Sequence, residues 1–142
     1  MKEEKKILEH VMGSRILFIS GCSDDARRLS RMLGDLPIAV QHVGTVQQAR
    51  IQLRREEYDV ILTEAELPDG RWPEVLSLAR EAPHATEVIV TDPRADSRFW
   101  AEVLNLGGYD LLAQPFYEPE VRRILHNACS RPPRQAAAMA AV

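Results

Sequence analysis

The run Val60-Ile61-Leu62 and the turn Leu67-Pro68-Asp69-Gly70 that follows it constrain the fold more than any other part of the chain. Three successive apolar residues, two of them β-branched, are too short a run for a helix and are typical of a central strand buried on both faces. Pro68 presets φ and Gly70 tolerates positive φ, so a tight turn is expected directly after this strand. Glu64 then lies where the strand leaves the sheet, which is where ligands bind in open α/β sheets.

The rest of the chain alternates short apolar strands with amphipathic helices. Beside the central strand, we expect strands at 15–20, 37–43, 87–91 and 110–113. We expect Ser23, Thr45 and Asp96 to cap helix N-termini, Pro73 and Pro119 to lie in the first turns of two further helices, and Gly107-Gly108 to end the helix that Asp96 begins. Because parallel strands need helical crossovers, the pattern predicts an α/β fold with a five-stranded parallel sheet and helices on both faces.

Length and composition indicate one domain of an ordinary soluble class. The chain has 142 residues and a net charge of −3, and no apolar run approaches the ~18 residues of a membrane span. We therefore expect no nucleic-acid partner and no membrane partner. Cys22 and Cys129 lack metal-site spacing and are expected to be free thiols in a cytoplasmic protein, and the scattered histidines predict no zinc site. No cofactor is expected. The predicted domain spans 14–130, after an N-terminal extension at 1–13, for which a short helix and a frayed terminus are both considered, and before a disordered tail at 131–142.

Several markers in a fixed order give the chain a family resemblance. They are the central strand with L-P-D-G at 67–70, Val88-Ile89-Val90-Thr91, G-G-Y-D at 107–110 and the Gln114-Pro115-Phe116 turn, for which a cis Pro bond is considered. With these markers, residues 14–129 resemble a response-regulator receiver domain of the CheY-like type. The resemblance implies a flavodoxin-like three-layer sandwich, a sheet of strand order 2-1-3-4-5 and a site at its carboxyl edge.

The resemblance also implies a degenerate site. Such receivers carry an Asp that accepts a phosphoryl group, an acid pair that holds Mg²⁺, a hydroxyl and a Lys. The matching positions here hold Glu64 for the acceptor, Ser20 and Gly21 for the acid pair, Thr91 for the hydroxyl and Gln114, before Pro115, for the Lys. Only the hydroxyl is kept. We therefore predict an atypical two-component receiver that is not an enzyme, binds no metal and serves as a phosphorylation-independent protein-interaction module.

The resemblance places a partner-binding face on the fourth helix, the fifth strand and the fifth helix. A histidine kinase, another regulator or a second copy of the chain is the expected partner. The residues implied for this face are Arg98, Trp100, Tyr109, Leu111, at the position of the family's aromatic switch, and Arg122. A Trp on such a helix more often packs in the core, and exposure would make Trp100 the first candidate hot spot.

Other interpretations of the same residues remain open. Asp24 and Asp25 are displaced acids for which a rescue of phosphotransfer is considered, although a capped helix start explains them better, and Asp69 is expected to face solvent. Glu64 either supplies a standing negative charge that imitates a phosphoryl group or fills space in an inert site. Cys22 and Arg28 have the Cys-x₅-Arg spacing of a phosphatase loop, and residues 20–23 faintly match a flavin phosphate loop.

Overall fold

A computed structural model describes residues 13–130, so the predictions for 1–12 and 131–142 lie outside the described residues. Within that range the strands are β1 (Ser14–Ile19), β2 (Ile38–Val43), β3 (Val60–Glu64), β4 (Glu66–Leu67), β5 (Gly70–Arg71), β6 (Glu87–Asp92) and β7 (Asp110–Ala113). The helices are α2 (Ser23–Met32), α3 (Val46–Arg55), α4 (Trp72–Glu81), α5 (Ser97–Asn105) and α6 (Glu118–Cys129).

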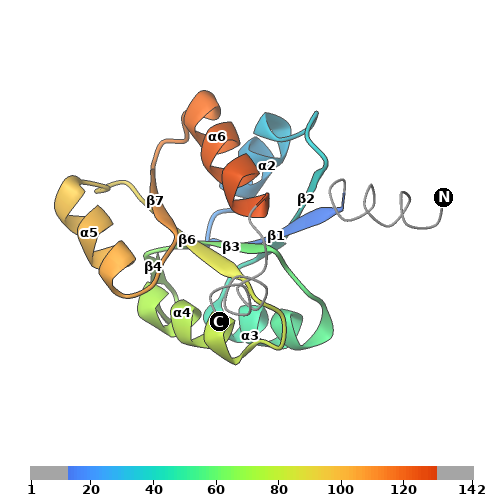
Figure 1. The fold of residues 1–142 in the computed structure, drawn as a ribbon, viewed down its shortest axis with the longest axis vertical. Coiled ribbons are helices and arrows are strands. Elements are labelled where there is room, and N and C mark those ends of the chain that lie inside the picture. Colours follow the sequence, from blue (N-terminus) through green and yellow to red (C-terminus); the bar gives the residue numbers. More distant parts are fainter. Residues whose placement is uncertain (1–12, 131–142) are drawn as a thin grey trace, which may run out of the picture.

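Five parallel strands form the main sheet in the order β2-β1-β3-β6-β7. This confirms the flavodoxin-like topology predicted as 2-1-3-4-5, because β6 and β7 are its fourth and fifth strands. The remaining two strands, β4 and β5, form a small antiparallel hairpin around the Pro68-Asp69 turn, where Leu67 pairs with Gly70. Figure 1 shows the sheet at the centre, with α2 and α6 over one face and α3 and α4 over the other.

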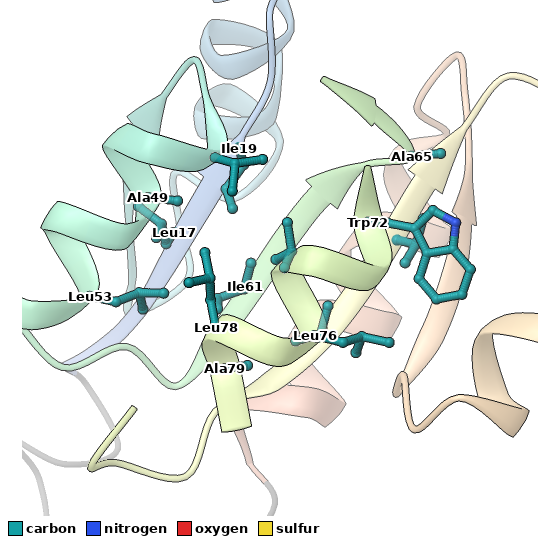
Figure 2. Close-up of a cluster of buried hydrophobic side chains, with 14 of the residues drawn as sticks. Leu17, Ile19, Ala49, Leu53, Ile61, Ala65, Trp72, Leu76, Leu78 and Ala79 are labelled. Atoms are coloured by element: carbon teal, nitrogen blue, oxygen red, sulfur yellow. The ribbon is translucent and has the colours of Figure 1, made fainter. Parts of the chain in front are cut away.

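Two apolar clusters, one on each face of the sheet, hold the layers together. Strand residues alternate between the clusters, because successive side chains of a strand point to opposite faces. Figure 2 shows the cluster under α3 and α4, where Leu17, Ile19 and Ile61 of the sheet meet Leu53 and Trp72. Trp72 is 1% exposed and packs against Phe99 of α5 at 5.9 Å between ring centroids, so it is a core residue. The opposite cluster joins Phe18, Leu62, Ile89 and Leu112 to α2 and α6.

Two of the three predicted N-caps are confirmed. Thr45 Oγ1 accepts the Gln48 N–H at 3.0 Å, and Asp96 Oδ1 accepts the Phe99 N–H at 2.8 Å. The prediction for Ser23 is wrong, because α2 begins at Ser23 itself and its N-cap, Cys22, makes no side-chain cap bond. The hydroxyl of Ser20 closes that turn instead by accepting the Cys22 N–H at 3.0 Å.

Two further expectations concern glycine and proline. Gly107 follows α5 with φ +102°, the left-handed conformation expected where glycines end a helix. The Gln114-Pro115 bond is cis, in agreement with the turn considered from the sequence. Among residues 13–130, no helix is both long enough and apolar enough to cross a membrane.

Candidate functional site

Four predicted site residues lie in one row across the carboxyl edge of the sheet. Each follows, by two positions, a core residue of the α2/α6 cluster: Ser20 follows Phe18, Glu64 follows Leu62, Thr91 follows Ile89 and Gln114 follows Leu112. Because side chains alternate along a strand, all four positions belong to the α2/α6 face of the sheet. The Cα atoms of Glu64 and Thr91 are direct partners in the β3–β6 register. The row therefore joins the four residues predicted from widely separated parts of the chain.

Glu64 is bound at the place where the family's acid pair would lie. Its Oε1 accepts the backbone N–H of Gly21 at 2.6 Å. Ser20 is fully buried, and its hydroxyl both accepts the Cys22 N–H at 3.0 Å and donates to the Cys22 carbonyl at 3.3 Å. Ser20 and Gly21 thus contribute no carboxylate. The carboxylate of Glu64, the one in this row, accepts a hydrogen bond from a backbone amide.

Thr91 and Gln114 supply polar groups that have no partner. Thr91 is 1% exposed, and neither its Oγ1 nor the Nε2 of Gln114, both buried atoms, has a hydrogen-bond partner within the described part of the chain. Pro115, which follows Gln114, is exposed, and Phe116 packs against Phe18 at 6.1 Å between ring centroids, below the row. The Glu64 carboxylate accepts the Gly21 N–H and forms no hydrogen bond with the Thr91 hydroxyl in this structure.

The neighbouring acids do not assemble a metal site. Asp24 lies in the first turn of α2 and forms an ion pair with Arg27 at 3.7 Å, and Asp25, half-buried, occupies the same turn. Residues 13–130 contain no group of three or more His, Cys, Asp or Glu side chains arranged to hold a metal ion. A Mg²⁺ ion wants several oxygen ligands, so Ser20 and Gly21 do not fit the ion that the family resemblance implies.

Asp69 has a role that the sequence did not indicate. It is exposed, as expected, but its two carboxylate oxygens accept the backbone N–H groups of Val46 at 2.8 Å and Gln47 at 3.0 Å. These bonds, that of Val46 foremost, lower the pKa of the Asp69 carboxyl. Asp69 therefore ties the β4–β5 turn to the N-terminus of α3. Since its partners are distant in sequence, no local pattern could have revealed this contact.

Two other residues beside the row were missed. The Nε2 atom of His42, on β2, lies 2.8 Å from the carbonyl oxygen of Ser20. Asp92 is buried directly after Thr91, and its carboxylate accepts the Arg94 N–H at 2.9 Å, which shapes the loop before α5. The Asp92-Pro93 pair signalled a break in the strand, but it gave no indication that Asp92 would turn inward.

The geometry disagrees with the phosphatase and flavin interpretations. Cys22 is exposed just before α2, but Arg28 lies within that helix, nearly two turns on. A phosphate cradle needs the intervening residues as a loop of convergent N–H groups, and residues 23–28 are helical instead. Residues 20–22 do form a short loop before α2, but the hydroxyl of Ser20 is already bonded to the Cys22 N–H and carbonyl, which does not suit a phosphate-binding loop.

The predicted partner face is only partly exposed. Arg98 is exposed, and Trp100 is 47% exposed, so the expectation that this Trp packs in the core is wrong. Its indole N–H donates to Asp110 Oδ1 at 3.0 Å, which holds the ring over the α5–β7 edge. The other three residues are engaged elsewhere: Leu111 is buried, Tyr109 packs against the α2/α6 cluster, and Arg122 bonds to the carbonyl of Met32 at 3.0 Å and pairs with Asp35.

Comparison of the sequence with known proteins finds a similar protein among curated ones. No protein-family model matches the chain. A protein of Sinorhizobium fredii described as "Probable transcriptional regulatory protein y4xI" is 29% identical over 99 residues, which is 70% of this chain and 44% of that protein. The chain thus spans less than half the length of this relative.

Solved structures give a stronger likeness, through the fold. A signal receiver domain of an HD domain-containing protein from Pseudomonas fluorescens is 26% identical with a TM-score of 0.72, over 81% of this chain and 93% of that one. The receiver domain of a sensor histidine kinase from Pseudomonas aeruginosa, which has magnesium in its active-site cleft, is 25% identical with a TM-score of 0.71, over 83% and 98%.

A third similar structure is the beryllofluoride-activated dimer of the NtrC4 receiver domain, 19% identical with a TM-score of 0.73, over 80% of this chain and 94% of that one. Each of these three matches spans at least four fifths of this chain, so each covers most of the sheet and its helices rather than a fragment. The strand order and the structures it matches lead to one conclusion: this chain has the CheY-like receiver fold that response regulators share.

Proposed function

We propose that this receiver domain is a protein-interaction module that works without phosphorylation at position 64. The observation that carries the proposal is the 2.6 Å hydrogen bond from the Gly21 N–H to Glu64 Oε1. Through this bond, the carboxylate at the acceptor position is engaged by a backbone amide. That amide belongs to the segment that would hold the metal in a phosphorylatable receiver. The module would accordingly signal by which partner it binds rather than by acquiring a phosphoryl group.

The chemistry of the row supports this proposal. Glu64 is one methylene longer than Asp, and a displacement of about 1 Å in a reacting group can cost roughly 100-fold in rate. Ser20 and Gly21 offer no charge to bind Mg²⁺, which would otherwise offset the charge of the transferring group. Gln114 can donate a hydrogen bond but carries no positive charge. All three departures act on the same transition state, so each adds to the barrier.

The proposal is tested by amide NMR with the isotopically labelled chain. Millimolar Mg²⁺ is added first, followed by beryllofluoride, which imitates a bound phosphoryl group. We expect no saturable shifts at Glu64, Thr91 and Gln114. In parallel, intact mass after incubation with acetyl phosphate and Mg²⁺ should show no phosphorylated species. Saturable shifts at these residues, spreading into β7, would contradict the proposal and revive the displaced-acid interpretation of Asp24 and Asp25.

A variant with the missing groups restored is the matched control. It combines Ser20→Asp, Gly21→Asp, Glu64→Asp and Gln114→Lys. Gly21 does not have a positive φ, and a Cβ placed there would meet only Glu64 Oε1, at 4.0 Å, so a side chain fits. We expect this variant to respond to Mg²⁺ and beryllofluoride. Its response would show that the fold can host the chemistry and that the four side chains decide the outcome.

A second candidate function is a receiver held active by the standing charge of Glu64. The two unpartnered groups, Thr91 Oγ1 and Gln114 Nε2, favour it, because a carboxylate that moved toward them would satisfy buried donors. The Glu64→Gln variant removes the charge with little change of shape. If the charge sets the conformation, amide shifts in α5 and β7 should differ between Glu64→Gln and the wild type. Identical spectra in those two elements would reject this candidate.

The partner-binding surface most accessible on the predicted face is the outer side of α5. Arg98 and Trp100 are its exposed members, and an exposed Trp is a frequent binding hot spot. We propose that a partner, either a histidine kinase, another regulator or a second copy, covers this surface. Sedimentation of the wild type across a concentration range tests the second copy. Trp100→Ala should weaken any dimer, whereas an equal effect of Tyr117→Ala, an exposed aromatic outside α5, would place the contact elsewhere.

A further inference from the structure

Helix α3 has an unusual charge pattern for a chain with a net charge of −3. Its ten residues contain three arginines and no acid, and they leave Ile51 45% exposed. Arg50 and Arg54 lie one turn apart, as do Ile51 and Arg55, so each pair shares a stripe of the helix. The outer surface of α3 is therefore both basic and partly apolar.

The arginines of α3 have no ion-pair partner in the described part of the chain. Three nearby acids are engaged elsewhere: Glu56 pairs with Arg15, Glu57 lies 3.6 Å from His84, and Asp69 accepts the N–H groups at the start of α3. Glu81 lines the same groove as Arg50 and Arg54 but forms no ion pair with them. The positive charge of Arg50 contributes to the low pKa of Asp69, but only as the weakest of its causes. Arg54 and Arg55 are exposed, and their side chains form no hydrogen bond or ion pair within residues 13–130.

A groove of about 210 Å³ runs between α3 and α4 beside these arginines. Its apolar wall comes from Leu53, Leu78, Ala82 and Pro83, and its polar groups are Arg50, Arg54 and Glu81. The Nε atom of Arg50 is buried and has no hydrogen-bond partner among the described residues. The half-buried side chain of Arg50 thus brings to the groove a positive charge that forms no ion pair within residues 13–130.

We propose that the groove between α3 and α4 docks an acidic, leucine-bearing segment of a partner protein. Carboxylates of that segment pair with Arg50 and Arg54, and an aliphatic side chain covers Leu53 and Leu78. Bidentate pairing with a carboxylate suits arginine, because its planar guanidinium presents parallel N–H donors. The proposal rests on the role of the chain as an interaction module, and it names the chemistry of the partner.

The observations favour a protein over a nucleic acid. The groove has an apolar wall that a phosphodiester backbone would not cover, and Glu81 on its rim would repel phosphates. The chain as a whole is acidic, whereas domains that bind nucleic acid usually have a net basic face or stripe of larger extent. An acidic peptide, unlike a regularly spaced phosphate backbone, can place its carboxylates at Arg50 and Arg54 and keep them clear of Glu81 by turning an apolar residue toward that side.

The test is an NMR titration of the labelled chain with a synthetic probe, the capped peptide Asp-Glu-Leu-Leu-Glu-Asp. We expect saturable amide shifts confined to α3 and α4, including Leu53, Leu78 and Ala82. The uncharged counterpart Asn-Gln-Leu-Leu-Gln-Asn should bind at least about tenfold more weakly, since it cannot form charge-assisted bonds. This titration contains no beryllofluoride and therefore does not test phosphorylation. A missing peptide response would reject the docking groove and leave the proposed phosphorylation independence unaffected.

Two variants locate the site. Arg54→Glu should weaken the peptide at least about tenfold, because it replaces an attraction with a repulsion. Arg28→Glu makes the same charge change at an exposed position of α2, on the other face of the sheet, and should leave the affinity unchanged. Equal losses in both variants, no saturable shifts, or tighter binding of a DNA duplex to the same residues would overturn the proposal.

Discussion

At the scale of single residues, the two cysteines show how strongly position controls chemistry in this fold. Cys22 is exposed ahead of α2, and Cys129, in the last turn of α6, is partly buried. Burial, followed by the negative charge of Asp59, raises the pKa of the Cys129 thiol to about 12. Because the thiolate is the reactive form, Cys129 is almost wholly unreactive at neutral and mildly alkaline pH.

We therefore expect one fast thiol in the native protein. With Ellman's reagent at pH 8, one equivalent should react quickly and the second only on unfolding. Cys22→Ser should abolish the fast phase, and Cys129→Ser should leave it intact. Two fast equivalents in the native wild type would show that α6 opens readily near its C-terminus.

At the scale of elements, Asp69 couples the β4–β5 hairpin to α3 through two backbone N–H groups. These bonds favour the ionised carboxylate and so lower its pKa from the ordinary value of 3.8. A lowered folded-state pKa means that the stabilisation is present above the unfolded-state pKa and is lost as the pH falls through the folded value. The contribution of Asp69 should thus be complete at pH 6 and absent in strong acid.

Asp69→Asn should accordingly destabilise the protein at pH 6, because a neutral amide is the weaker acceptor. The free energy of unfolding from urea titrations measures this effect. The difference from wild type should shrink below about pH 4 and vanish in stronger acid. Glu102→Gln, an exposed change on α5, serves as the control and should show no such pH-dependent difference. A constant difference at every pH would mean that charge is not the cause.

The N-caps show why some element boundaries could be predicted and others not. Thr45 and Asp96 were predicted correctly, because each bonds to an N–H three residues ahead and the required partners are local in sequence. The prediction that Ser23 is an N-cap was wrong, because the hydroxyl of Ser20 accepts the Cys22 N–H in the turn that precedes α2. The role of Asp69 was invisible, because its partners lie 22 and 23 residues away and only the folded chain brings them together.

At the scale of the whole molecule, the strand alternation made the sheet predictable, whereas the site residues at its carboxyl edge were implied by the family resemblance. Apolar periodicity indicates which strand residues face each helix layer, and the structure places the implied site residues two positions beyond Phe18, Leu62 and Ile89 on the same face. The contacts that residues around the row make with distant parts of the chain could not be predicted from the sequence. The contacts of His42 with Ser20 and of Arg122 with Asp35 join residues 22 and 87 apart, and the sequence carries no local sign of either.

The core layer beneath the row should govern global stability. Ile89 is fully buried in the central part of the sheet, so Ile89→Ala should cost about 2–5 kcal/mol in the free energy of unfolding. The same substitution at Ile51, 45% exposed on α3, is the matched control and should stay within about 0.5 kcal/mol. Urea unfolding measures both. Similar losses at the two positions would contradict the assignment of the α2/α6 cluster as a well-packed core.

The two tryptophans make the protein its own optical reporter. Trp72 is sealed in the interior and Trp100 stands half in water, so a dissolved quencher such as iodide can reach the second indole and not the first. A binding partner that settles on α5 would shield Trp100 and blunt the quenching. A partner held between α3 and α4 would leave it untouched. Iodide quenching of tryptophan fluorescence in the unlabelled chain can thus show whether a newly found partner binds at α5 or between α3 and α4.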